Sequence, residues 1–464
     1  MNLKALLYSV AIALQLCTMA QSDMIGYSLG KTLPQANLLN PAFLPDYRVS
    51  VGLPGLSGFH THTGQNFTNL DVLTVTDTSQ FVNTDDVFKQ IKNNNRIVNG
   101  NTINLFHVGV RGLRSYSAFS VNTRTFARVT IPRDVFILAV EGNASENLDE
   151  GIVELNDMSG FAVGFTEVAI SHGREFFDGK FTLGARLKYL VGHGVVNAPT
   201  LDAQLITYGS PTFRGDSVAL INNGSEVRAA GAIGAALLDS ESDLSSETLT
   251  SGRGFGLDLG ATYQFSDRLS FSASLLDLGF INWNDEYAYQ GEVTPASYTF
   301  SGVDFVDLVS GEETSFDSEL DSAINDLEYI EGSGEGFATS LTSRFYAAAT
   351  YQLTERQTAS AVLYNEIYKG SFIPALAAIY NFQSGTFFNF SFSGTIMNGR
   401  INNLGTGITL NLLPFQLVLA TNDLLSLANP MKARTADIRV GINHTFGKIS
   451  RRKKNEEAKK LLTE

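Results

Sequence analysis

The feature that most constrains this chain is a period-two alternation of apolar with polar or small residues. The pattern is clear at 180–192 and recurs at 254–265, 403–412 and 436–446. Successive side chains of a β-strand point to opposite faces, so each run predicts a strand with one apolar and one polar face. We therefore expect an all-β protein.

Strand length separates the two architectures that produce this alternation. A soluble sandwich buries its apolar faces, whereas a membrane barrel turns them toward lipid. The runs span about 9 to 13 residues, which suits a tilted strand that crosses a bilayer. Aromatic residues near strand ends, such as Tyr263, Phe265 and Phe446, fit interfacial girdles. We predict an antiparallel transmembrane β-barrel, and a soluble exported multi-sandwich binding protein is the competing interpretation.

The alternation also gives a strand count. Candidate strands lie at 46–53, 103–110, 115–123, 161–171, 180–192, 201–208, 254–265, 269–282, 343–353, 358–368, 372–382, 386–397, 403–412, 414–421 and 436–446. Bacterial barrels have an even number of strands, so about 14 or 16 are expected. The alternation slips at Leu275-Leu276, which predicts a β-bulge there.

The segments between strands predict loops with short helices. Residues 54–102 are interpreted as a long polar insert, with an amphipathic helix at 84–93. Residues 304–335 hold eleven acids and no base, which is typical of a solvated loop. Residues 448–464 carry seven Lys or Arg and form an expected basic periplasmic tail.

The first twenty residues are predicted to be a secretory signal peptide. Lys4 gives a positive start, 5–16 is apolar, and the small residues around Ala20 favour cleavage there. Cys17 lies inside this peptide, and a lipid anchor at Cys17 is the alternative. No other window offers 18 uncharged apolar residues, so we expect a chain exported to the bacterial outer membrane.

Composition excludes several classes of function. Lys plus Arg is 33 and Asp plus Glu is 47, so the formal charge of −14 argues against a nucleic-acid partner. The chain has one Cys, which excludes a disulfide scaffold and a multi-thiolate metal site.

Few residues suggest chemistry. His60-x-His62 places two imidazoles on one strand face, but a third metal ligand is not evident nearby. His444 shares the outward register of Phe446, which favours an interfacial residue over a catalytic one. The glycines of 254–260 do not open a helix, which argues against a dinucleotide loop. We expect no enzyme activity, no cofactor and no metal.

Four charged residues fall on the predicted lumen face, namely Arg186, Lys188, Asp258 and Arg439. A lumen charge needs water or a partner, so structural ion pairing is the favoured role. Selectivity in a channel is the alternative.

Three motifs carry a family resemblance. Asn-Pro-Ala-Phe at 40–43 precedes the first strand, Gly-Phe-Gly-Leu-Asp-Leu-Gly at 254–260 opens a central strand, and Leu-Leu-Asp-Leu-Gly-Phe-Ile-Asn-Trp at 275–283 ends the next. Together they resemble an uncharacterised family of bacterial outer-membrane barrels. That family is similar to the long-chain fatty-acid transporter (FadL-like) barrels and to the barrels of type IX secretion and gliding (PorP/SprF/PorV-like).

The resemblance implies a division of the chain and a role. Residues 21–45 would form a luminal plug or hatch, in which Asn40, Pro41 and Phe43 shape the turn into the barrel at 46–447. Proline residues in this segment also disfavour a strand. The implied function is passage of hydrophobic small molecules across the outer membrane. The alternative is a non-transporting scaffold of a cell-surface or type IX secretion complex. The expected partners are outer-membrane lipid and either a hydrophobic ligand or surface proteins.

Overall fold

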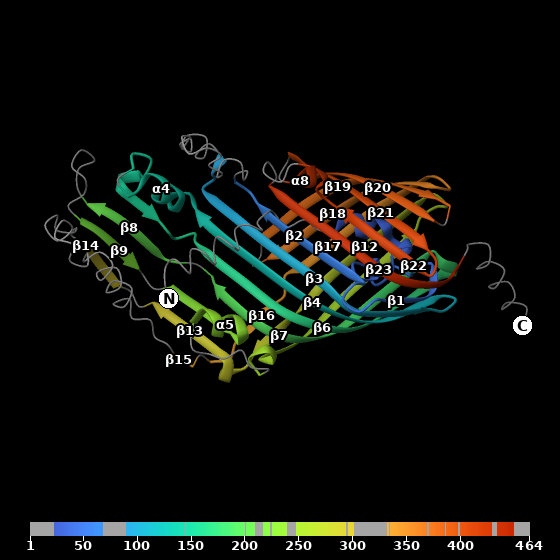
Figure 1. Cartoon of the computed structure of the whole chain (residues 1–464), viewed down its shortest axis with the longest axis horizontal. Helices are drawn as coiled ribbons and strands as arrows, with labels where there is room; N and C mark the ends of the chain where they lie inside the picture. The colour runs from blue at the N-terminus through green and yellow to red at the C-terminus, as the bar shows by residue number, and fades with distance from the viewer. Residues whose placement is uncertain are drawn as a thin grey trace, which may run out of the picture.

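The computed structural model is dominated by one antiparallel sheet that closes on itself (Figure 1). The residues that the structure describes are 23–67, 90–143, 145–199, 201–208, 217–222, 225–238, 247–293, 296–300, 332–333, 335–368, 371–385, 387–397, 400–428 and 434–449. The predicted signal peptide lies outside these ranges. So do most of the predicted helix at 84–93, most of the acidic insert and nearly all of the basic tail.

Fifteen strands form the wall of the barrel. They are β1 (Tyr47–Gly52), β2 (Gly58–Gln65), β3 (Asn94–Arg111), β4 (Ser115–Pro132), β6 (Ser159–Phe176), β7 (Phe181–Ala198), β11 (Gly252–Gln264), β12 (Leu269–Trp283), β17 (Ser343–Thr354), β18 (Gln357–Tyr368), β19 (Ser371–Ser384), β20 (Phe388–Met397), β21 (Arg400–Leu412), β22 (Phe415–Thr421) and β23 (Thr435–Lys448).

The wall closes through the first strands. β1 and β2 each pair with β23 on one side and with β3 on the other, so the two share one position. The fifteen strands therefore fill fourteen positions, and the predicted fold class is confirmed. Closure leaves no sheet edge inside the wall, as a lipid-embedded sheet requires.

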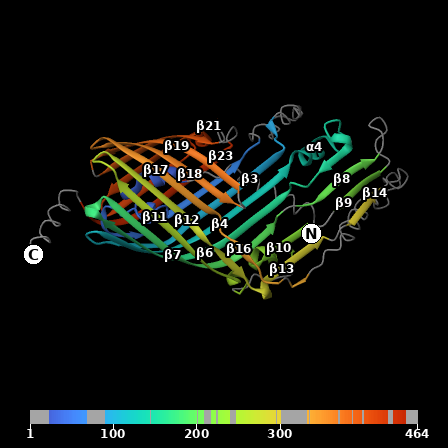
Figure 2. The ribbon, with the colours of Figure 1, turned by 180° about the vertical axis from the view of Figure 1, so that it is seen from behind.

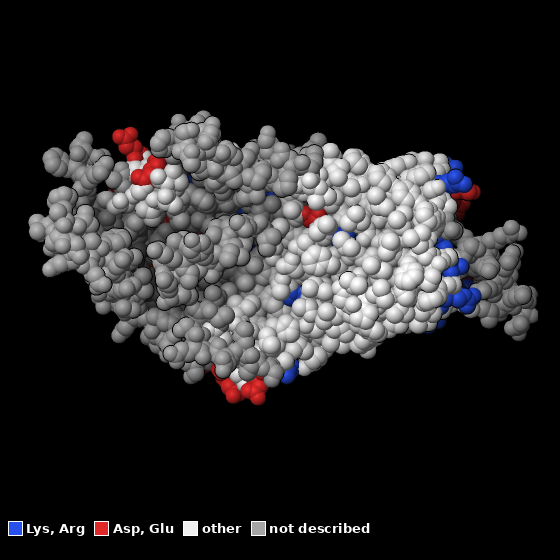
Figure 3. Space-filling model, viewed as in Figure 1, with Lys and Arg blue, Asp and Glu red and all other residues white. Residues whose placement is uncertain are grey.

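The outer face of the wall is apolar. Ile170, Leu187, Phe255 and Phe372 point outward and are 64–68% exposed. Figure 3 shows few charged residues along the middle of the barrel, while Lys and Arg gather at the end nearest the C-terminus. This side of the barrel provides the apolar band that spans a membrane.

The short turns define the orientation. β3 and β4, β6 and β7, β11 and β12, and β17 and β18 are joined by two to four residues at one end. Longer connections at 133–158, 199–251 and 284–342 join strands at the other end (Figure 2). Bacterial barrels keep short turns on the periplasmic side, so the short-turn end is the expected periplasmic end.

The strands are longer than the alternation predicted. β3, β4, β6 and β7 each have 18 residues, and β2 with the first half of β3 occupies part of 54–102. The interpretation of 54–102 as a continuous loop insert was wrong. About 9–11 residues cross a bilayer, so the strands continue beyond lipid, where neither face needs apolar side chains.

A second sheet lies beyond the long-loop end of the barrel (Figure 1). It consists of β5 (Ile152–Glu154), β8 (Ala203–Tyr208), β9 (Ser217–Asn222) and β14 (Ala296–Phe300). The strand predicted at 201–208 is therefore real but does not belong to the barrel. Helix α4 (Arg133–Glu141) contributes Ile137 to a small core with Leu148 and Val153 of this outer region.

Four shorter strands and two further helices lie within the described ranges. β10 (Ser225–Ala230), β13 (Ala288–Val293), β15 (Gly332–Ser333) and β16 (Ala338–Ser340) extend the main sheet, and α5 (Gly231–Leu238) and α8 (Leu424–Ala428) lie in connections. None of the helices within the described ranges is long and apolar enough to cross a bilayer.

The N-terminal segment, residues 23–45, lies within the barrel. It contains α2 (Met24–Leu29) and the 3-10 turns η1 (Gly30–Thr32) and η2 (Pro34–Leu38). Buried residues of this segment form one core with inward residues of β12, β17, β18, β19 and β22. The inner wall here carries Ala348, Ala375, Ala377 and Ala420 beside larger apolar residues, so it is apolar where the alternation predicted a polar face.

Wall strands from around the barrel also hydrogen-bond to this segment. The bonds join Ser171 Oγ to Asn37 Oδ1 (2.8 Å), Arg186 Nη1 to Leu38 O (3.4 Å), Ser274 Oγ to Leu39 O (2.7 Å), Gln416 Nε2 to Thr32 O (2.9 Å) and Asn443 Nδ2 to Gln35 Oε1 (2.9 Å). Three of these bonds pair backbone carbonyls and two pair side-chain oxygens of the segment. Burying polar groups is unfavourable unless they are paired, so these donors allow an irregular segment to sit inside the barrel.

Two glycines of the wall make room for the segment. A Cβ atom on Gly184 would lie 2.2 Å from the Pro41 carbonyl carbon and oxygen, and one on Gly260 would lie 2.1 Å from Asn40 Oδ1. A Cβ on Gly394 of β20 meets nothing within 4 Å. The backbone of the Asn40-Pro41 turn therefore touches the backbone of β7 and β11.

Replacement of Gly184 or Gly260 by Ala is expected to loosen the N-terminal segment, because the added methyl group overlaps the turn. We expect Gly184→Ala to lower the free energy of unfolding by about 1–3 kcal/mol and to speed proteolysis within residues 23–45. Gly394→Ala is the matched control and should change neither. Equal behaviour of the Gly184 and Gly394 variants would contradict the close contact.

Candidate functional site

A cluster of charged side chains lies on the inner wall beside the N-terminal segment. Its members come from β4, β6, β7, β11, β12 and β17, and they are Arg124, Glu167, Arg186, Lys188, Asp258, Asp277 and Arg344. We call these seven residues the luminal charge cluster. Four are basic and three are acidic, so the cluster has a formal net charge of +1.

Asp277 is the centre of the luminal charge cluster. Its Oδ1 lies 2.7 Å from Arg124 Nη1 and 2.6 Å from Lys188 Nζ, and its Oδ2 lies 2.6 Å from Arg344 Nη2. The Asp277 backbone N–H donates to Asp258 Oδ1 at 2.7 Å. One carboxylate therefore joins three cations that come from three different strands.

A β-bulge brings Asp277 to this position. Leu257 pairs with Leu278 and Leu259 pairs with Leu275, so Leu276 and Asp277 both face the single residue Asp258. Asp277 has φ 61°, a conformation that Asp tolerates better than most residues. The predicted bulge is confirmed, and it turns both Leu276 and Asp277 toward the lumen, where they are fully buried.

The predicted lumen charges occupy distinct places. Lys188 Nζ lies 2.7 Å from Asp258 Oδ1, and Arg186 Nη1 lies 3.8 Å from Asp258 Oδ2. Arg439 lies apart from the luminal charge cluster and forms an ion pair with Asp23 at the start of the N-terminal segment. All four predicted residues thus have a charged partner in the lumen.

The predicted hatch residues shape a turn against the wall. The Asn40 carbonyl accepts a hydrogen bond from the Phe43 N–H (2.9 Å), with Pro41 at the second turn position. Asn40 Nδ2 donates to Ala273 O (3.1 Å) and to the Tyr27 hydroxyl (3.1 Å). Phe43 packs edge-on against Tyr27, and burial raises the pKa of the Tyr27 hydroxyl.

The histidines singled out in the sequence have structural partners. His60 Nε2 lies 2.7 Å from Asp437 Oδ2, and the His60 and His62 rings are 5.3 Å apart. His444 packs edge-on against Phe415 at 4.5 Å on the outer side. In the described part of the chain, no group of three His, Cys, Asp or Glu residues is placed to hold a metal ion.

A cavity adjoins the luminal charge cluster on the long-loop side. We call it the upper cavity, and its volume is about 70 Å³. Its apolar lining residues belong to one hydrophobic cluster and form one wall, namely Phe126, Phe161, Val163, Phe165, Ile281 and Leu341. Charged residues of both signs also line the cavity, among them Arg124, Asp277, Arg344 and Glu366. Barrel interiors are usually polar, so an apolar wall that faces the lumen departs from the common pattern.

A larger cavity lies on the short-turn side of the N-terminal segment. We call it the lower cavity; its volume is about 560 Å³, and its lining is mainly polar. Lys31, Arg268, Arg356, Gln383 and Asn389 are among its residues. The lumen therefore has a small partly apolar space on one side of the segment and a wide polar space on the other.

Sequence reasoning missed four members of the luminal charge cluster, namely Arg124, Glu167, Asp277 and Arg344. A signal existed for Glu167 and Arg344, because each is a charged residue inside a strand and faces inward by register. Asp277 stood in the quoted motif, but the bulge that turns it inward made its face ambiguous. Arg124 lies beyond the predicted end of its strand.

The closed wall, the outward apolar band and the partly filled lumen define an outer-membrane-type β-barrel. A family model matches residues 41–422, and the chain belongs to that family, which is described as a family of unknown function, DUF5723. The matched region includes both aspartates of the bulge. No curated protein matches the chain.

Solved structures with a similar shape are distant barrels. The toluene transporter TbuX of Ralstonia pickettii is 11% identical, with a TM-score of 0.41 over 89% of this chain and 94% of that chain. A Pseudomonas aeruginosa FadL homologue is 12% identical, with a TM-score of 0.39 over 90% and 96%. The toluene transporter TodX of P. putida is 9% identical, with a TM-score of 0.39 over 88% and 92%.

Loss of the Asp277 carboxylate should destabilise the barrel. Asp277→Asn removes the buried negative charge that Arg124, Lys188 and Arg344 share. We therefore expect the free energy of unfolding, measured in denaturant, to fall by about 3 kcal/mol. Asp178→Asn is the control, because Asp178 pairs with Arg114 at the surface and its side chain is 90% exposed. Fluorescence of the single tryptophan, Trp283, reports both transitions. Similar midpoints for the two variants would refute a central role of Asp277.

Proposed function

We propose that this protein passes hydrophobic small molecules across the outer membrane. In this proposal the upper cavity receives the molecule from the long-loop side. The N-terminal segment is the barrier between this cavity and the lower one. The observation that carries the proposal is the apolar wall of the upper cavity, which faces a lumen that barrels usually line with polar residues.

The geometry also sets a requirement for transport. The upper cavity of about 70 Å³ holds only a few carbon atoms, so a larger molecule needs neighbouring side chains to move. Leu341 is a suitable moving part, because it is half-buried and lies in the short connection between β16 and β17. Its backbone N–H donates to Gly279 O at 2.9 Å, which holds the connection while the side chain rotates.

Filling the upper cavity should reduce uptake. We expect Leu341→Trp to lower the uptake rate of a radiolabelled alkylbenzene by about tenfold in cells that lack the chromosomal copy, because the indole occupies the apolar space. Leu341→Met keeps the volume and is the matched control. Heat-modifiable migration in electrophoresis checks that both variants fold. Uptake by the Leu341→Trp variant at the wild-type rate would count against transport through this cavity.

A second candidate function is a non-transporting scaffold. It is favoured by the fixed position of the N-terminal segment, which is bonded to β6, β7, β12, β22 and β23. The separate sheet of β5, β8, β9 and β14, with its own core, offers a surface outside the membrane.

The scaffold role predicts stable partners at the cell surface. Mild cross-linking of cells, followed by purification of the full-length protein, should recover the same surface proteins from wild type and from the Leu341→Trp variant. Deletion of residues 145–157, which carry β5, should remove them if the outer sheet is the contact. Recovery of no cross-linked protein would contradict the scaffold role.

A further inference from the structure

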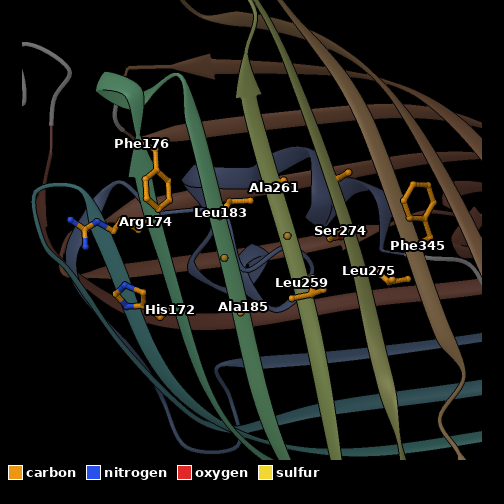
Figure 4. A pocket seen from close by; sticks show the side chains of 13 residues that line it. His172, Arg174, Phe176, Leu183, Ala185, Leu259, Ala261, Ser274, Leu275 and Phe345 are labelled. Carbon is orange, nitrogen blue, oxygen red and sulfur yellow. The ribbon is translucent and has the colours of Figure 1, made fainter.

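A third hollow lies on the outside of the barrel, away from the upper and lower cavities of the lumen. It is a groove of about 730 Å³ over β6, β7, β11, β12 and β17, and its lining is almost entirely apolar (Figure 4). We call it the outer groove. In Figure 4 the N-terminal segment lies behind the strands, so the groove is on the lipid side of the wall.

Small residues form the groove. Ala185, Ala261 and Ala273 lower the surface between leucine side chains on the same strands. A neighbouring depression of about 500 Å³ shares Ala261 and Ala273 and continues over Ala347, Ala361 and Leu376. Two connected apolar hollows of this size match the two acyl chains of one lipid molecule.

Two basic residues border the outer groove on β6. His172 and Arg174 both point outward and are exposed, and Figure 4 shows them side by side at one edge. Arg174 pairs with Leu183, and Leu183 pairs with Ala261. The arginine is therefore level with Ala261 across the strands that form the groove.

The next row toward the short turns is aromatic. Phe176 pairs with Phe181, Phe181 pairs with Tyr263 on its other side, and Tyr263 pairs with Phe271. Such a row marks the membrane–water interface in outer-membrane barrels. Arg174 is two residues further into the membrane, which is about 7 Å along a strand.

The Arg174 guanidinium carbon lies 6.0 Å from the centre of the Phe176 ring, so the long side chain extends toward the aromatic row and the headgroup level. An arginine beside lipid is unfavourable unless an anion meets its charge. A free phosphate ion would satisfy the charge but would not fill the apolar hollows. We propose that the outer groove binds an anionic glycerophospholipid of the periplasmic leaflet. Its acyl chains occupy the two hollows, and its phosphate meets Arg174, with His172 beside it.

The proposal is tested by lipid retention. Full-length protein in detergent is equilibrated with equal amounts of phosphatidylglycerol and phosphatidylethanolamine and examined by native mass spectrometry. We expect wild type to retain phosphatidylglycerol about fivefold over phosphatidylethanolamine, and Arg174→Gln to lose this preference. Ala261→Leu, which fills the shared floor, should lower retention of both lipids.

Two variants serve as controls. Arg253→Gln removes another exposed arginine at the opposite end of β11, and Ala378→Leu adds the same bulk at an exposed alanine of β19 outside the groove. Both should retain lipid as wild type does. The proposal is overturned if wild type shows no preference, or if the Arg174 and Ala261 variants behave as their controls. Uptake of alkylbenzene is a separate readout, so failure here leaves the luminal proposal unaffected.

Discussion

Pairing of every backbone group within lipid is the constraint on which this structure depends. A sheet that spans a bilayer must close, because an unpaired edge cannot be solvated there. Here closure uses β1 and β2 as one position between β23 and β3. Closure creates an interior that must also be filled, and residues 23–45 occupy part of it. The inward alanines of β17, β19 and β22 are explained by this packing.

The two family motifs at 254–260 and 275–283 meet at one bulge. Their aspartates, Asp258 and Asp277, face each other across β11 and β12, and the glycine at 260 receives the Asn40-Pro41 turn. A buried carboxylate is unfavourable unless cations surround it, which explains the arginines and the lysine on neighbouring strands. The motifs therefore specify how the N-terminal segment, the bulge and the charges fit together, and the upper cavity lies beside them.

The sequence predicted the barrel because lipid imposes a strict period of two, as at 180–192. It could not predict the full 18 residues of β3 or β7, since the strands continue beyond lipid, where the period is lost. The inward alanines of β17, β19 and β22 also obscured the place of the N-terminal segment, because apolar packing replaces the polar lumen face there. Arg186, Lys188 and Asp258 were found from their register alone. Asp277 was not predicted to face the lumen, because a bulge moves one residue to the other face of the strand. The pairing with the neighbouring strand is needed to identify that residue.

Contact of the outward side chains with acyl chains is the central claim, and Trp283 allows a direct measurement. This single tryptophan is 2% exposed and packs inside the wall. In bilayers of brominated phospholipid, its fluorescence should keep nearly the intensity seen in unbrominated lipid. A Trp283→Phe chain with Leu187→Trp on the outward face should be strongly quenched. The opposite pattern, with Trp283 quenched and the residue at 187 unaffected, would contradict the barrel orientation described above.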